Sequence, residues 1–83
     1  MKKYFLYAGY YELIFSTKPL DKPYIFLSWH KSIKNAEKAA KKFDPEAHYV
    51  FENAELRAEY FEECVGYSPM DEDNLDIYPL LSA

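Results

Sequence analysis

Residues 24–52, YIFLSWHKSIKNAEKAAKKFDPEAHYVFE, have the pattern of a strand, a helix and a second strand. Residues 24–29 are apolar at both alternating parities, which predicts a central strand that is covered on both faces of its sheet. Residues 47–52 predict a second, short strand. Because a strand–helix–strand unit favours a right-handed parallel crossover, this stretch predicts a sheet with a helix packed on it.

The helix of this stretch is predicted over residues 33–43. Ser32 is a suitable N-cap, and Asp44-Pro45 ends the helix because proline restricts the residue before it. On a helical wheel the apolar residues fall within an arc of roughly 120°; they are Ile33, Ala36, Ala39, Ala40 and Phe43. The opposite side carries lysines, namely Lys34, Lys38, Lys41 and Lys42. We therefore expect one buried face and one basic stripe.

The N-terminal segment is dense in aromatic and β-branched residues. Residues 3–8 and 10–16 suit a pleated surface and predict strand structure. Gly9 is either a tight turn between two strands or a bulge in one long strand, and the sequence does not decide between them. Residues 17–23 predict a loop, since Pro19 and Pro23 bracket residues 20–22 within it.

A second helix is predicted over residues 54–65, with Asn53 as its N-cap and Gly66 in the usual position after its C-terminus. Its apolar stripe is formed by Ala54, Ala58, Phe61 and Val65, widened by Leu56, Tyr60 and Cys64. Its remaining face carries Glu55, Glu59, Glu62 and Glu63. The two helices thus present stripes of opposite charge.

These elements predict an α+β fold, a two-layer α/β sandwich with two helices on one face of a small mixed sheet of three or four strands. One compact domain is expected over residues 1–66. Residues 67–83 form an acidic C-terminal tail, which either is a mobile arm or adds an edge strand over residues 75–81.

The composition is that of a small globular protein with 83 residues, 19% aromatic residues and a net charge of −4. Residues 1–43 carry a net charge of +6 and residues 44–83 a net charge of −10. The single cysteine excludes an internal disulfide, and no stretch approaches the roughly 20 apolar residues that span a bilayer. We expect a cytoplasmic protein with a reduced thiol.

No catalytic, cofactor-binding or metal-binding motif is present in the sequence. His30 and His48 lack the additional ligands that a zinc site requires, and Cys64 lies beside glutamates that oppose thiolate formation. Glu12 interrupts an aromatic strand, so it either points outward at an edge, which we favour, or points into a pocket. A small enzyme that uses His30, His48 or Glu12 is the least favoured hypothesis, and we expect no enzyme.

The charge distribution instead favours a protein-binding module. A dense set of carboxylates is able to occupy a basic surface evolved for nucleic acid, with tyrosines as apolar anchors. The candidate contacts are Glu55, Glu59, Glu62, Glu63, Asp71, Glu72, Asp73 and Asp76. A homodimer through the tyrosine-rich surface is a further option. The alternative is a nucleic-acid-binding domain that uses Lys34, Lys38, Lys41 and Lys42, although the chain has a single arginine.

In size, acidity and lack of catalytic residues, the chain resembles small phage-encoded inhibitors of host defence, such as anti-CRISPR proteins. No specific motif carries this resemblance. It implies a phage protein that inhibits a host defence or nucleic-acid-binding protein by covering its basic surface.

Overall fold

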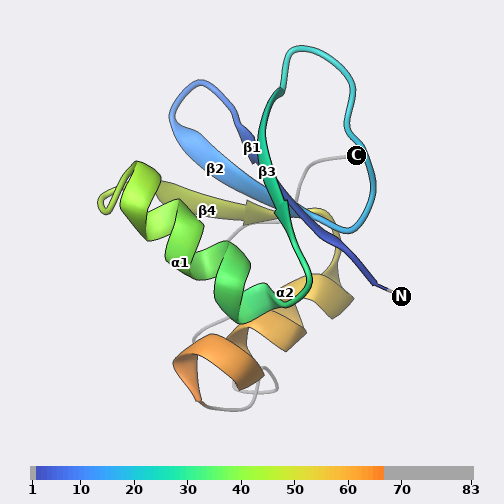
Figure 1. The fold of residues 1–83 in the computed structure, drawn as a ribbon, viewed down its shortest axis with the longest axis vertical. Coiled ribbons are helices and arrows are strands. Elements are labelled where there is room, and N and C mark those ends of the chain that lie inside the picture. Colours follow the sequence, from blue (N-terminus) through green and yellow to red (C-terminus); the bar gives the residue numbers. More distant parts are fainter. Residues whose placement is uncertain (1, 67–83) are drawn as a thin grey trace.

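A computed structural model describes residues 2–66 of the chain. Four strands, one α-helix between the third and fourth strands, and a C-terminal helical segment follow one another (Figure 1). The elements are β1 (Tyr4–Ala8), β2 (Glu12–Ser16), β3 (Ile25–His30), α1 (Ile33–Phe43), β4 (His48–Phe51), α2 (Ala54–Tyr60) and η1 (Phe61–Val65). The predicted tail over residues 67–83 and its option of an added edge strand lie outside the described residues.

The strands form one mixed sheet in the order β3-β1-β2-β4. β1 is antiparallel to both β2 and β3, and β2 is parallel to β4. It follows that β3 and β4 run in the same direction at opposite edges, and that α1 carries the chain across the two central strands. The predicted α+β class, with a mixed sheet and two helices, is confirmed.

The turn at Gly9 resolves the choice that the sequence left open. β1 and β2 form a hairpin in which the Gly9 amide donates a hydrogen bond to the Glu12 carbonyl over 2.9 Å. Gly9 is therefore part of a tight turn and not of a bulge, and the hairpin places Tyr10 and Tyr11 at its tip.

The prediction that residues 24–29 form a central strand is wrong, because β3 lies at an edge of the sheet. The register of β3 against β1 shifts between Leu6 and Tyr7, which leaves Leu27 as an additional residue. A bulge of this kind changes the parity of the strand. Leu27 consequently packs against the core while Phe26 and Trp29 are exposed. Apolar residues at both parities reflect this bulge and not burial on two faces.

The core lies between the sheet and the helices and is largely aromatic. Phe15 of β2 stacks on Phe51 of β4 with ring centroids 5.2 Å apart, and Tyr60 of α2 lies 5.1 Å from the Phe51 ring. Side chains from both helices share one cluster with one face of the sheet, so the helices cover that face. The buried members are Tyr4, Leu6, Leu13, Phe15, Ile33, Ala36, Ala40, Tyr49, Phe51, Leu56, Tyr60 and Phe61.

Both predicted helix caps are present. The Ser32 hydroxyl accepts a hydrogen bond from the Asn35 amide over 3.2 Å, and the Asn53 side chain accepts one from the Leu56 amide over 2.9 Å. Phe43, which the helical wheel placed on the buried face, is more than half exposed. It is the last residue of α1 and lies in the wall of a cavity beside Ala8 and Leu13 of the sheet.

The second helix widens at its C-terminal end. A regular α-helix ends at Tyr60, and the turn over η1 is a π-helix. Gly66 closes this turn in the left-handed conformation, with φ of 94°, and its amide donates a hydrogen bond to the Phe61 carbonyl over 2.7 Å. Glycine suits this position because a side chain is strained at positive φ. The predicted C-terminal glycine is confirmed.

Candidate functional site

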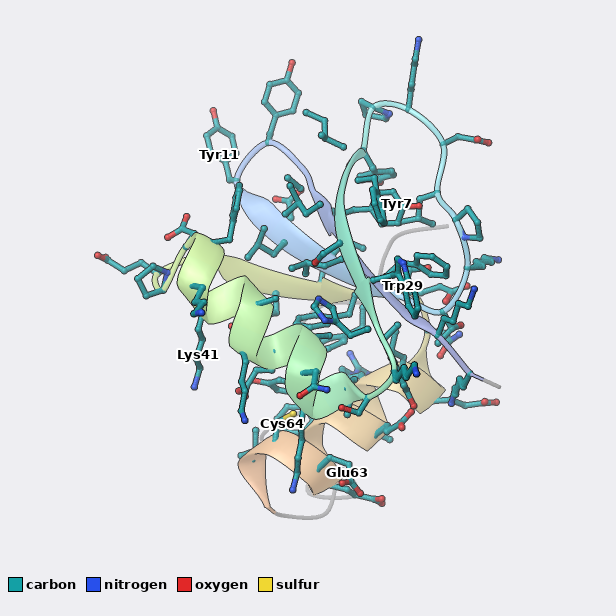
Figure 2. The ribbon with its side chains drawn as sticks, in the orientation of Figure 1. Tyr7, Tyr11, Trp29, Lys41, Glu63 and Cys64 are labelled. Carbon is teal, nitrogen blue, oxygen red and sulfur yellow. The ribbon has the colours of Figure 1, made fainter. Side chains whose placement is uncertain are left out.

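Four large apolar side chains are exposed where the β1–β2 turn, the start of β3 and the end of α1 meet. The exposed fractions are 89% for Tyr10, 82% for Tyr11, 64% for Ile25 and 58% for Phe43. We call this set the hairpin-end surface. Tyr10 and Tyr11 have ring centroids 6.0 Å apart, and Figure 2 shows Tyr11 pointing away from the turn.

Two cavities open on the hairpin-end surface, one on each side of the turn. The larger, with a volume of about 450 Å³, lies between the turn and the residues that lead into β3. The smaller, of about 260 Å³, lies between the turn and the C-terminal end of α1 and contains Phe43 and Asp44 in its wall. Both cavities share Ala8, Gly9, Tyr10 and Glu12.

Glu12 stands at the centre of this arrangement. It is the first residue of β2 and lines both cavities. The sequence analysis favoured an outward position at an edge for Glu12. The structure instead supports the other option, because β2 is a central strand and Glu12 lies at a pocket. Within residues 2–66, its carboxylate takes part in no ion pair and accepts no hydrogen bond. A half-buried carboxylate without a partner is a ready acceptor for an incoming donor.

The two histidines do not join Glu12 in a cavity. His48 is its neighbour in the parallel register of β2 and β4, but His48 lines neither cavity. His30 lies on β3, where its Nε2 atom is 2.8 Å from the Ser28 hydroxyl and burial lowers its pKa. No group of three or more His, Cys, Asp or Glu side chains suited to a metal ion occurs among the described residues.

The glutamate stripe of the second helix is not a uniform surface. Glu55, Glu62 and Glu63 are exposed. Glu59 instead accepts a hydrogen bond from the Tyr4 phenol and lies 3.1 Å from the Lys2 ammonium. Glu59 therefore stabilises the fold, and its carboxylate is already engaged by Tyr4 and Lys2. The remaining predicted carboxylates, Asp71, Glu72, Asp73 and Asp76, lie outside the described residues.

Three of the four lysines in the stripe of α1 form no ion pair with another residue in the range 2–66. Lys34, Lys38 and Lys42 are exposed, while Lys41 lies 3.4 Å from Glu37 one turn earlier. Cys64 lies where the two helices meet (Figure 2). Burial, Glu37 and Glu63 raise the pKa of its thiol to about 11, although Lys34 and Lys41 act in the opposite direction. This thiol is a poor nucleophile.

A second exposed aromatic group lies on the sheet face away from the helices, where Phe26 and Trp29 of β3 are about half exposed. The Lys3 ammonium lies 4.9 Å from the centroid of the Trp29 ring, and Phe26 contacts the rings of Phe5 and Tyr7. The sequence did not indicate this exposure, because the strand had been predicted to be central.

Comparison with known proteins gives no relative. No protein-family model matches the chain, and neither a curated protein nor a solved structure matches it. None of the helices in the described part of the chain combines the length and the hydrophobicity needed to cross a bilayer.

Proposed function

We propose that this chain is a non-catalytic protein-binding module whose main contact is the hairpin-end surface. One observation carries the proposal, namely the gathering of four exposed apolar side chains, Tyr10, Tyr11, Ile25 and Phe43, around two cavities at one end of the sheet. Burial of such a group of exposed apolar side chains against a partner protein removes apolar surface from water, and this favours binding.

The residue types support a protein partner. Tyrosine has a large apolar ring with a hydroxyl that remains able to form hydrogen bonds, and it is enriched among the residues that dominate interface energies. The cavities beside the turn offer recesses for side chains of the partner, and anchors in recesses are typical of such interfaces. Among the residues from the described part of the chain that line the two cavities, no nucleophile is paired with a base.

The acidic helix supports a basic partner. Glu55, Glu62 and Glu63 project from α2 and η1, and no ion pair within residues 2–66 involves them. Exposed carboxylates of this kind attract a basic surface over a distance and increase the rate of association. These carboxylates suit an inhibitor that covers the basic surface of a host defence or nucleic-acid-binding protein. The phage type and the cytoplasmic location of this inhibitor remain part of the proposal from the composition of the chain. The hairpin turn and η1 lie at opposite ends of the described fold (Figure 1), so a partner that contacts both surfaces spans its length.

Affinity capture with tagged protein tests the main contact. The double variant Tyr10→Ser/Tyr11→Ser is expected to lose the partner that the wild-type chain captures. The matched control is Trp29→Ser, which removes an exposed aromatic residue from a different face. Retention of the partner by the double variant, or equal loss by the control, contradicts the proposed role of the hairpin-end surface.

A further inference from the structure

We propose that the larger cavity of the hairpin-end surface binds a basic side chain of the partner protein, preferably an arginine. We call it the Glu12 cavity. This inference rests on the proposed protein-binding function and specifies what the site recognises. The cavity is lined by Ala8, Gly9, Tyr10, Glu12, Pro23, Tyr24 and Ile25.

The charge in the wall of the Glu12 cavity is the first argument. Among the residues of the described range 2–66 that line it, Glu12 is the single charged one. Its carboxylate is half-buried and has neither an ion pair nor a hydrogen bond within residues 2–66. Partial burial removes water from a carboxylate, and a charge-assisted hydrogen bond from a cationic donor compensates for that loss. The cavity is thus complementary to a positive charge and not to an anion.

The remaining walls are the second argument. The lining includes the aromatic residues Tyr10 and Tyr24 and the aliphatic residues Pro23 and Ile25. Aromatic faces attract cations, and the planar guanidinium group stacks on them while it donates two parallel hydrogen bonds to a carboxylate. Apolar walls also accommodate the methylene groups of a basic side chain. A volume of about 450 Å³ is large enough for a side chain with its adjoining backbone.

The position of Gly9 is the third argument. A Cβ atom at Gly9 would lie 2.5 Å from Oε1 of Glu12 and 3.2 Å from Cδ1 of Ile14. Real Cβ contacts are longer, so any larger residue at position 9 displaces the carboxylate. Glycine at the turn therefore allows the Glu12 carboxylate to lie against the backbone inside the cavity.

The test requires no identified partner. The wild-type chain is titrated with N-acetyl-arginine methylamide, and amide chemical shifts are followed by NMR. We expect saturable shifts at Gly9, Tyr10, Tyr24 and Ile25, with affinity at least tenfold weaker for the citrulline analogue, which has a similar shape but no charge. Glu12→Gln is expected to reduce the affinity for the arginine probe at least tenfold, and Gly9→Ala to reduce it by displacing the carboxylate. Glu46→Gln is the matched control, since Glu46 is an exposed carboxylate that lines neither cavity.

Equal binding of the arginine probe and its citrulline analogue would show that the cavity does not recognise charge and would overturn the inference. Shifts that persist unchanged in Glu12→Gln, or the absence of shifts at the cavity, also overturn it. Failure of this inference is distinguishable from failure of the proposed function. If the arginine probe does not bind but Tyr10→Ser/Tyr11→Ser still loses the partner, then the protein-binding function holds and the Glu12 cavity is not its arginine site.

Discussion

The Tyr4 phenol on β1 donates a hydrogen bond to the carboxylate of Glu59 on α2. The Lys2 ammonium lies 3.1 Å from the same carboxylate. Burial together with this glutamate raises the pKa of Tyr4 to about 12. The contact fastens the first strand of the sheet to the second helix, so one of the four glutamates in the acidic stripe has a structural role.

Glu59→Gln is expected to destabilise the fold, because the carboxylate accepts charge-assisted hydrogen bonds that an amide replaces only in part. We expect the free energy of unfolding to fall by about 1–2 kcal/mol, measured by urea denaturation. Glu55→Gln is the control on the same helix, and this exposed residue is expected to change the stability by less than about 0.5 kcal/mol. Equal effects of the two substitutions would contradict the structural role of Glu59.

Glu52 follows β4 and links it to the start of the loop after β2, at Thr17 and Lys18. It accepts hydrogen bonds from the Thr17 amide over 2.9 Å and the Thr17 hydroxyl over 2.8 Å, and it lies 3.2 Å from the Lys18 ammonium. Burial by itself raises the pKa of Glu52, but these hydrogen bonds and the Lys18 charge outweigh it and leave the pKa below its ordinary value. The charged form is therefore favoured by folding.

Because its pKa is lowered, Glu52 contributes to the stability of the fold in a way that depends on pH. A carboxylate whose pKa is lower in the folded state contributes stability above the unfolded pKa of 4.5, and the contribution is lost as the pH falls through the folded pKa. Glu52→Gln is expected to lower the free energy of unfolding by about 1–2 kcal/mol near neutral pH. The difference from wild type should shrink in acid. Urea denaturation across this range checks it, and a difference independent of pH would refute the assignment.

Cys64 is expected to react slowly with alkylating agents. Its thiol pKa is raised from 9.0 to about 11, chiefly by burial. Since the thiolate is the reactive species, the raised pKa reduces the reaction rate at neutral pH by roughly 100-fold relative to an unperturbed thiol. Iodoacetamide alkylation followed by mass spectrometry measures this rate, and the same chain unfolded in urea is the control. A native rate equal to the unfolded rate would disagree with the buried environment.

The parts of the fold that depend on local chemistry were predictable from the sequence. Ser32 and Asn53 identify the starts of both helices because their side chains satisfy backbone amides directly. The apolar face of α1 predicted the burial of Ile33 and Ala36 from periodicity alone. These signals act within one or two turns, so they need no knowledge of the rest of the chain.

The candidate site could not be predicted in the same way, because it depends on how separate elements meet. The bulge at Leu27 places apolar residues of β3 on both faces, which made an edge strand resemble a central one. Phe43 matches the buried stripe of α1, but it is the last residue of that helix and is more than half exposed. Glu12 faces a cavity because the hairpin turn and the approach to β3 lie side by side. None of these relationships has a local signature.

The charged faces of the two helices lead to opposite outcomes in a binding experiment. Replacement of Glu55, Glu62 and Glu63 by lysine is expected to weaken binding to a basic partner more than tenfold at low salt, and less at high salt because salt screens exposed charges. Replacement of Lys34, Lys38 and Lys42 by glutamate is the matched reversal on α1 and should leave that affinity unchanged or improve it.

The nucleic-acid alternative makes a different prediction. If it is correct, the wild-type chain slows the migration of duplex or single-stranded probes in a gel shift, and the lysine reversal abolishes this effect. Two results together would exclude both charged faces as contacts: the variant with the three glutamates replaced binds the partner as tightly as wild type, and the wild-type chain does not change the migration of the probes. The hairpin-end surface would then remain as the contact.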